Sequence, residues 1–270
     1  MKNIKINLKD VCKSNCITNA FISAYICDEV EDLVTYPRPA IIVIPGGGYW
    51  HCSPREAEPV ALRFLAEGFN VFVLEYTCGQ KYPAPHLDLT LAMDYITKNA
   101  EELKTDANRV FMMGFSAGAH LVLTYSYLYD ELAKTLKIKN DCLKPSKIAV
   151  GYPVVSCMIN DTSKTIRIIT DNDQSLYKKL STELNITSNY PKTFVFGTKD
   201  DQIISFENSV RLVDALKKNK VPYKQIAYEH GPHGFCLSNR GVYEENRTDY
   251  EILNKLVDWP NEVAKFFYEN

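Results

Sequence analysis

The chain of 270 residues lacks the features that mark membrane proteins and nucleic-acid-binding proteins. No apolar run approaches the roughly 18 residues of a membrane-spanning helix, and the N-terminal stretch MKNIKINLKDVCKSNC has no apolar core of the signal-peptide kind. With 31 basic and 33 acidic side chains, the sequence shows neither a basic stripe nor an acidic tail. We therefore expect a cytoplasmic protein with no membrane partner and no nucleic-acid partner.

Sequence signals for a bound metal or a redox cofactor are also missing. The segment CKSNC holds Cys12 and Cys16, but no second Cys/His pair follows at zinc-finger spacing. No G-x-G-x-x-G is present, so the sequence does not support binding of a nicotinamide or flavin cofactor. The 8 cysteines are scattered along a chain without an export signal, which favours free thiols over a disulfide framework. The sequence thus predicts no metal site and no cofactor.

The chain does contain a regular alternation of short apolar runs and helical patterns. Runs that read as buried strands are AIIVIP (40–45), NVFVLEY (70–76), RVFMMG (109–114), KIAVGYP (147–153), KTFVFGT (192–198) and YKQIAYE (223–229). With helical periodicity between them, they predict an α/β fold: one domain over residues 1–270, with a mostly parallel, doubly wound sheet and helices on both faces. We expect one or two antiparallel edge strands within 17–30, and a short helical insertion forming a small lid over about 157–190.

The segment RVFMMGFSAGAH, residues 109–120, places a serine between two glycines directly after an apolar run. Gly114, Ser116 and Gly118 fit the pattern G-x-S-x-G, and a helical stretch follows. This order of strand, turn and helix is what a nucleophile elbow requires, because the serine must stand on a sharp turn at the carboxyl edge of the sheet. We interpret Ser116 as a nucleophile, although a small residue in a tight turn is the simpler alternative.

A nucleophilic serine needs a base, and the base needs a carboxylate to orient it. Beyond the elbow helix only His230 and His233 remain, both in EHGPHGF after the last predicted strand. We favour His233, which lies deeper in that loop, and read His230 as a loop-packing residue. Past the preceding strand stand Asp200 and Asp201. We favour Asp201 as the acid, because Ile203 and Ile204 would pack its loop onto the core.

The segment VIPGGGYW supplies candidate oxyanion donors. Glycines 46–48 follow a predicted strand directly, where backbone N–H groups can reach a substrate oxygen, and Ala117 follows the nucleophile. Tyr49 and Trp50 would stack on a sugar ring or serve as packing. The acids Glu56 and Glu58 begin the next helix, where they favour its dipole.

With these residues in place, the chain resembles α/β-hydrolases of the esterase/lipase group. More narrowly, it is similar to bacterial acetylesterases of the acetyl-xylan-esterase-like type, the endo-1,4-beta-xylanase B-like or BD-FAE-like hydrolases. The matching pieces run from about residue 38 to 240 in the family's order, and include RPAIIVIPGGGYW, NRVFMMGFSAGAHL and HGPHGF. The resemblance implies an α/β-hydrolase fold with Ser116 as nucleophile, Asp201 as acid, His233 as base, and Gly47, Gly48 and Ala117 at the oxyanion hole.

The sequence therefore predicts a serine hydrolase of carboxylic esters with small acyl groups. The resemblance points to an acetylesterase of acetylated sugars or xylo-oligosaccharides, so the expected partner is a small-molecule ester. Whether two copies form a homodimer is open. The alternatives are another acyl hydrolase on the same triad, such as an arylformamidase or a small peptidase, and a catalytically silent binding protein that keeps the fold.

Overall fold

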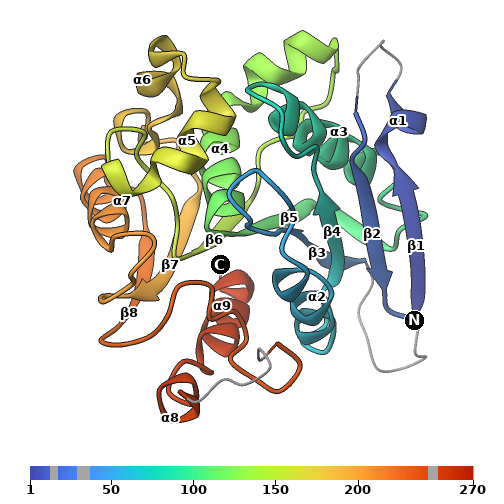
Figure 1. Cartoon of the computed structure of the whole chain (residues 1–270). Coiled ribbons are helices and arrows are strands. Elements are labelled where there is room, and N and C mark those ends of the chain that lie inside the picture. Colours follow the sequence, from blue (N-terminus) through green and yellow to red (C-terminus); the bar gives the residue numbers. More distant parts are fainter. Residues whose placement is uncertain (13–17, 29–36, 243–248, 270) are drawn as a thin grey trace.

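A computed structural model shows an eight-stranded sheet with helices on both faces (Figure 1). The structure describes residues 1–12, 18–28, 37–242 and 249–269. The strands are β1 (Lys2–Asn7), β2 (Phe21–Ile26), β3 (Arg38–Ile44), β4 (Asn70–Glu75), β5 (Thr105–Phe115), β6 (Lys147–Gly151), β7 (Lys192–Thr198) and β8 (Tyr223–Tyr228). Their order in the sheet is β1-β2-β4-β3-β5-β6-β7-β8.

The helices follow the strands in the alternation that the sequence predicts. The α-helices are α1 (Leu8–Val11), α2 (Glu58–Leu65), α3 (Ala84–Lys98), α4 (Ala117–Leu136), α5 (Ser163–Thr170), α6 (Tyr177–Leu180), α7 (Glu207–Lys218), α8 (Tyr250–Leu253) and α9 (Trp259–Tyr268). Short 3₁₀ turns are η1 (Pro54–Glu56), η2 (Asn160–Thr162), η3 (Gln174–Leu176) and η4 (Thr182–Leu184). None of the helices in the described ranges is long and apolar enough to cross a membrane.

Strand pairing confirms the predicted sheet. Strands β3 to β8 pair in parallel, whereas β1 and β2 pair in an antiparallel manner at one edge. The sequence prediction of edge strands covered β2 but not β1, whose charged and largely exposed residues hide the apolar signal. It also missed α9, whose Trp259, Phe266 and Phe267 are buried against the sheet.

The core lies in two layers, one on each face of the sheet, because side chains of a strand point alternately to opposite faces. In β3, Ile42 and Ile44 face the layer covered by α3, α4 and α7, whereas Ile41 and Val43 face the layer covered by α2 and α9. Both layers are closed, so the strands read as continuous apolar runs in the sequence.

The parallel arrangement brings the loops after β3, β5, β6, β7 and β8 to one edge of the sheet, where ligands bind in open α/β folds. The predicted insertion is a series of short helices, η2 to η4 with α5 and α6, that begins after β6. One sequence expectation is corrected: Cys12 is disulfide-bonded. Six other cysteines are free thiols as expected, namely Cys27, Cys52, Cys78, Cys142, Cys157 and Cys236.

Candidate active site

Ser116 stands on a sharp turn between β5 and α4. Its backbone has φ 52° and ψ −115°, a conformation that L-residues rarely adopt. The glycines on either side permit it: a Cβ on Gly118 would lie 2.2 Å from the Ile44 carbonyl oxygen, and one on Gly114 would lie 2.5 Å from the Gly118 carbonyl oxygen. The Ser116 N–H donates to the Gly151 carbonyl at 3.0 Å, which ties the turn to β6.

The structure brings together the three residues that the sequence singles out. His233 Nε2 lies 2.9 Å from Ser116 Oγ, and His233 Nδ1 lies 2.7 Å from Asp201 Oδ2. Because a carboxylate only accepts hydrogen bonds, Nδ1 carries the proton and Nε2 is left to accept from the serine hydroxyl. The Asp201 side chain is 2% exposed and that of His233 is 12% exposed, so the pair is largely shielded from water.

Asp201 is held by its own loop as well as by His233. Its Oδ1 accepts hydrogen bonds from the backbone N–H groups of Ile203 and Ile204, at 2.8 and 2.9 Å. Of the two isoleucines expected to pack this loop onto the core, only Ile204 is buried. The side chain of Ile203 is 62% exposed and lines the cleft over Ser116.

A cleft of about 540 Å³ opens over the serine. Its lining includes Gly47, Gly48 and Ser116 together with His233, and α5 of the insertion contributes Thr165. Ala117 is the first residue of α4, so its N–H has no acceptor within the helix. The cleft thus combines the Ser116 hydroxyl with a glycine loop and the N-terminus of a helix.

Two buried polar residues that sequence reasoning missed adjoin this cleft. Glu56 is 4% exposed, and its carboxylate accepts from the Gly46 N–H at 2.8 Å and from the Tyr152 hydroxyl at 2.7 Å. The Tyr152 ring lies edge-on to the His233 imidazole, with centroids 5.0 Å apart. Burial raises the pKa of Glu56, although both hydrogen bonds and the nearby His233 oppose the rise. Sequence offered no signal beyond the acid at a helix start.

Tyr49 and Trp50 lie in contrasting environments. Tyr49 is fully buried, and its hydroxyl lies 2.8 Å from Nδ1 of His120, so its ring is a core residue and not part of the cleft lining. Trp50 is 73% exposed and stands between the cleft residues Gly48 and His51 in the sequence. The Trp50 ring is thus open to solvent beside the glycine loop, although Trp50 is not among the residues that line the cleft. Burial also lowers the pKa of His120 to about 4, which suits a structural residue.

A second Asp–His pair lies on the neighbouring surface. His230 Nδ1 is 2.9 Å from Asp200 Oδ2, and Asp200 Oδ1 accepts from the Gly231 N–H at 2.8 Å. The side chains of His230 and Asp200 are 74% and 45% exposed. These are the two residues that the sequence analysis set aside in favour of His233 and Asp201.

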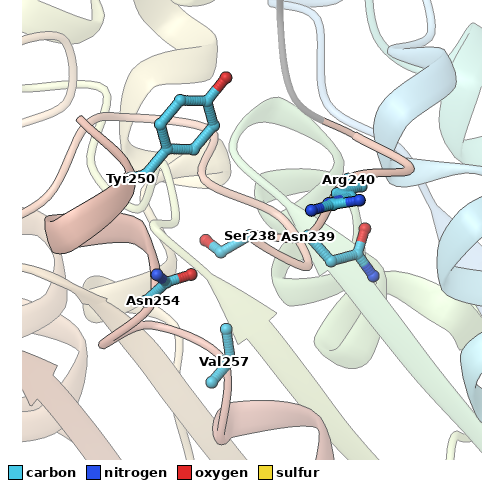
Figure 2. Close-up of a pocket in the computed structure, with 6 residues that line it drawn as sticks. All are labelled: Ser238, Asn239, Arg240, Tyr250, Asn254 and Val257. Carbon is cyan, nitrogen blue, oxygen red and sulfur yellow. The ribbon is translucent and has the colours of Figure 1, made fainter. Parts of the chain in front are cut away.

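A larger cavity, about 810 Å³, lies elsewhere, between residues 238–240 and 250–257. Figure 2 shows Asn239 and Arg240 on one side, Tyr250 and Asn254 on the other, and Ser238 between them. It contains none of the residues described above, so we assign the chemistry to the smaller cleft over Ser116. Within the described ranges, no three His, Cys, Asp or Glu side chains are grouped so as to hold a metal ion.

Comparisons with known proteins agree with this architecture. Among curated proteins, endo-1,4-beta-xylanase B of Butyrivibrio fibrisolvens is 29% identical over 213 residues, which is 75% of this chain and 33% of that protein. The chain thus spans about one third of the length of this relative.

Solved structures match over nearly the whole chain. The carboxylesterase Cest-2923 of Lactobacillus plantarum has a TM-score of 0.84 at 26% identity, covering 98% of this chain and 96% of that one. An acetyl ester-xyloside bifunctional hydrolase of Caldicellulosiruptor lactoaceticus has a TM-score of 0.78 at 29% identity, covering 98% and 95%. The predicted α/β-hydrolase fold is thereby confirmed.

The BD-FAE family model matches residues 32–216, a span that contains Ser116 and Asp201 and ends before His233. Because this match covers more than half of the chain, the protein belongs to the BD-FAE family.

Proposed function

We propose that this chain is a serine hydrolase that cleaves carboxylic esters with small acyl groups through an acyl-enzyme. The observation that carries the proposal is the hydrogen-bonded series from Asp201 through His233 to Ser116 Oγ. A serine hydroxyl alone is a poor nucleophile at neutral pH, and such a series is the arrangement that activates it. The carboxylesterase among the solved structures supports the same reaction type.

The reaction proceeds in two halves. Ser116 Oγ attacks the ester carbonyl carbon while His233 Nε2 takes the hydroxyl proton, and the resulting imidazolium is stabilised by Asp201. Collapse of the tetrahedral intermediate re-forms the carbonyl and breaks the bond between the acyl carbon and the alkoxy oxygen, and His233 gives its proton to the leaving alcohol. Water then attacks the acyl-serine with His233 as base, which releases the acid and restores Ser116.

Backbone N–H groups would stabilise the oxyanion. We assign this role to Gly47, Gly48 and Ala117, since the glycines line the cleft beside Ser116 and Ala117 opens α4. The positive end of the α4 dipole points at the same place. Donors of this kind are each worth about 3 kcal/mol in the transition state.

The proposed substrates are acetylated sugars or xylo-oligosaccharides. The names of the xylanase B relative and of the acetyl ester-xyloside hydrolase support this class. The cleft of about 540 Å³ has a size suited to a small ester, and the exposed Trp50 follows the glycine loop that lines it.

Hydrolysis of p-nitrophenyl acetate, butyrate and octanoate by the wild type and by Ser116→Ala tests the proposal. We expect turnover to fall steeply with acyl length and to be lost in the variant, after which acetate release from acetylated xylo-oligosaccharides is measured. Full activity of Ser116→Ala would remove Ser116 as nucleophile. No ester turnover, combined with cleavage of an aryl formamide or a dipeptide, would favour the arylformamidase or peptidase alternative. Failure to label Ser116 with a fluorophosphonate would favour a silent binding protein.

A further inference from the structure

The Glu56 carboxylate is an unusual group to find beside an uncharged serine. Burying a carboxylate costs free energy unless hydrogen bonds or opposite charges compensate. Its hydrogen bonds come from a backbone N–H and a phenol, and the charges of His233 and Arg55 oppose the rise that burial causes in its pKa. A leucine in its place would leave the Gly46 N–H and the Tyr152 hydroxyl without these acceptors, so the carboxylate is needed for what its two oxygens hold.

The two partners of Glu56 belong to opposite sides of the candidate active site. Gly46 precedes the glycine loop that lines the cleft, and Tyr152 follows β6 and backs the His233 ring. Glu56 Oε2 holds the first through its N–H and Oε1 holds the second through its hydroxyl. The Glu56 side chain therefore connects the glycine loop, which holds the proposed oxyanion donors, to Tyr152, which packs against His233.

The connection also passes close to the nucleophile. A Cβ on Gly46 would lie 2.9 Å from Glu56 Oε2 and 3.0 Å from the Cβ of Ser116. The backbone of Tyr152 is fixed independently, since its N–H donates to the Phe196 carbonyl at 2.6 Å and its ring is 3% exposed. Tyr152 therefore has an attachment to β7 that does not involve Glu56, and Glu56 positions Gly46 relative to it.

We propose that Glu56 is a positioning residue for ester hydrolysis, whose carboxylate clamps Gly46 to Tyr152 and so fixes the oxyanion loop relative to His233. The inference rests on the proposed function, because it assigns Glu56 to the Ser116 site. The clamp requires two hydrogen bonds and not a charge. A glutamine can supply both, with its carbonyl accepting from Gly46 and its amide donating to the Tyr152 oxygen.

The test compares steady-state hydrolysis of p-nitrophenyl acetate by the wild type, Glu56→Ala, Glu56→Gln and Tyr152→Phe. Turnover is expressed per serine titrated with a fluorophosphonate, so that unfolded protein does not count. A misplacement near 1 Å at a reacting centre costs about 10²-fold, and we expect Glu56→Ala to lose kcat on this order with KM within about threefold. Tyr152→Phe breaks one of the two bonds and should lose about tenfold in kcat. Glu56→Gln should stay within about fivefold of the wild type.

Glu58, two residues along the chain and exposed at the start of α2, provides the matched control. Glu58→Ala should match the wild type in kcat and KM. The clamp would be overturned if Glu56→Ala kept the wild-type kcat per titrated serine. If Glu56→Ala does not fold, the same result in Tyr152→Phe would overturn it. Loss in Glu56→Gln equal to that in Glu56→Ala would overturn it as well. Full activity of Ser116→Ala would refute the proposed function itself. Failure of the clamp and failure of the proposed function therefore give different results.

Discussion

Two Asp–His pairs stand side by side in this molecule and share almost the same local chemistry. In the pair Asp200–His230 the joined atoms are 2.9 Å apart, and in the pair Asp201–His233 they are 2.7 Å apart. In both, the second carboxylate oxygen accepts hydrogen bonds from the backbone, from two N–H groups in Asp201 and from one in Asp200. They differ in what the far side of the imidazole meets: a serine hydroxyl for His233, and a largely exposed position for His230.

The proposed function makes only His233 a general base, so an Asp–His hydrogen bond by itself does not assign that role. Asp201 is almost fully buried and oriented by its own loop, so its charge acts on His233 with little screening by water. Asp200 and His230 are screened by solvent and join the loop after β7 to the loop after β8. The candidate catalytic pair differs from the exposed pair in two ways: it is buried, and its imidazole also contacts the Ser116 hydroxyl. The exposed pair only joins two loops.

The largest expected effect comes from breaking each pair at its histidine. We expect His233→Ala to lower kcat/KM for p-nitrophenyl acetate by about 10⁵-fold or more, because loss of the base of a triad removes most of its catalysis. His230→Ala should stay within about twofold of the wild type, since it touches neither Ser116 nor the cleft. Equal losses in the two variants would mean that the exposed pair takes part in the reaction.

Breaking the pairs at their carboxylates should give a smaller contrast. Asp201→Asn leaves an amide that favours the wrong imidazole tautomer, so we expect a loss of about 10⁴-fold in kcat. Asp200→Asn should leave kcat within about twofold. The two variants are measured with the same ester, after circular dichroism shows that both fold. Retention of more than about a tenth of the activity in Asp201→Asn would contradict the assigned role of Asp201.

The edge of the sheet that holds both pairs could be predicted from the sequence, because it depends on topology. Strands β5, β7 and β8 run parallel and end at one edge, so the loops after them hold Ser116, Asp201 and His233 at the same edge. The preference for His233 over His230 rests on its place in the loop, between Pro232 and Gly234. The expectation that both isoleucines pack this loop onto the core holds for Ile204 but not for Ile203. Backbone N–H groups, which no side-chain pattern reveals, hold the carboxylate.

Residues that depend on long-range side-chain contacts could not be predicted. Glu56 and Tyr152 are 96 residues apart, and nothing in PREAEP distinguishes an acid that caps a helix from one that turns inward. Tyr49 was expected near a substrate because it follows the glycine loop, but the turn at Gly47 and Gly48 directs its ring toward His120 in the core. The periodicity of apolar residues predicts which side chains of a helix or strand face the core, but it does not predict where a side chain points in an irregular loop.

The smallest expected effect is a change in the pKa of Asp200, in the exposed pair, when His230 is removed. The hydrogen bond with His230 is the largest cause that lowers the pKa of Asp200 below its ordinary value, and the Gly231 N–H adds to it. In His230→Ala we therefore expect the pKa of Asp200 to rise toward that ordinary value but not to reach it, because the Gly231 contact remains. Carbon-detected NMR of the carboxylate across the acid range measures this directly, with Asp200→Asn identifying the signal. An unchanged pKa would show that the His230 contact is not formed in solution, and the exposed pair would then no longer be comparable with the buried one.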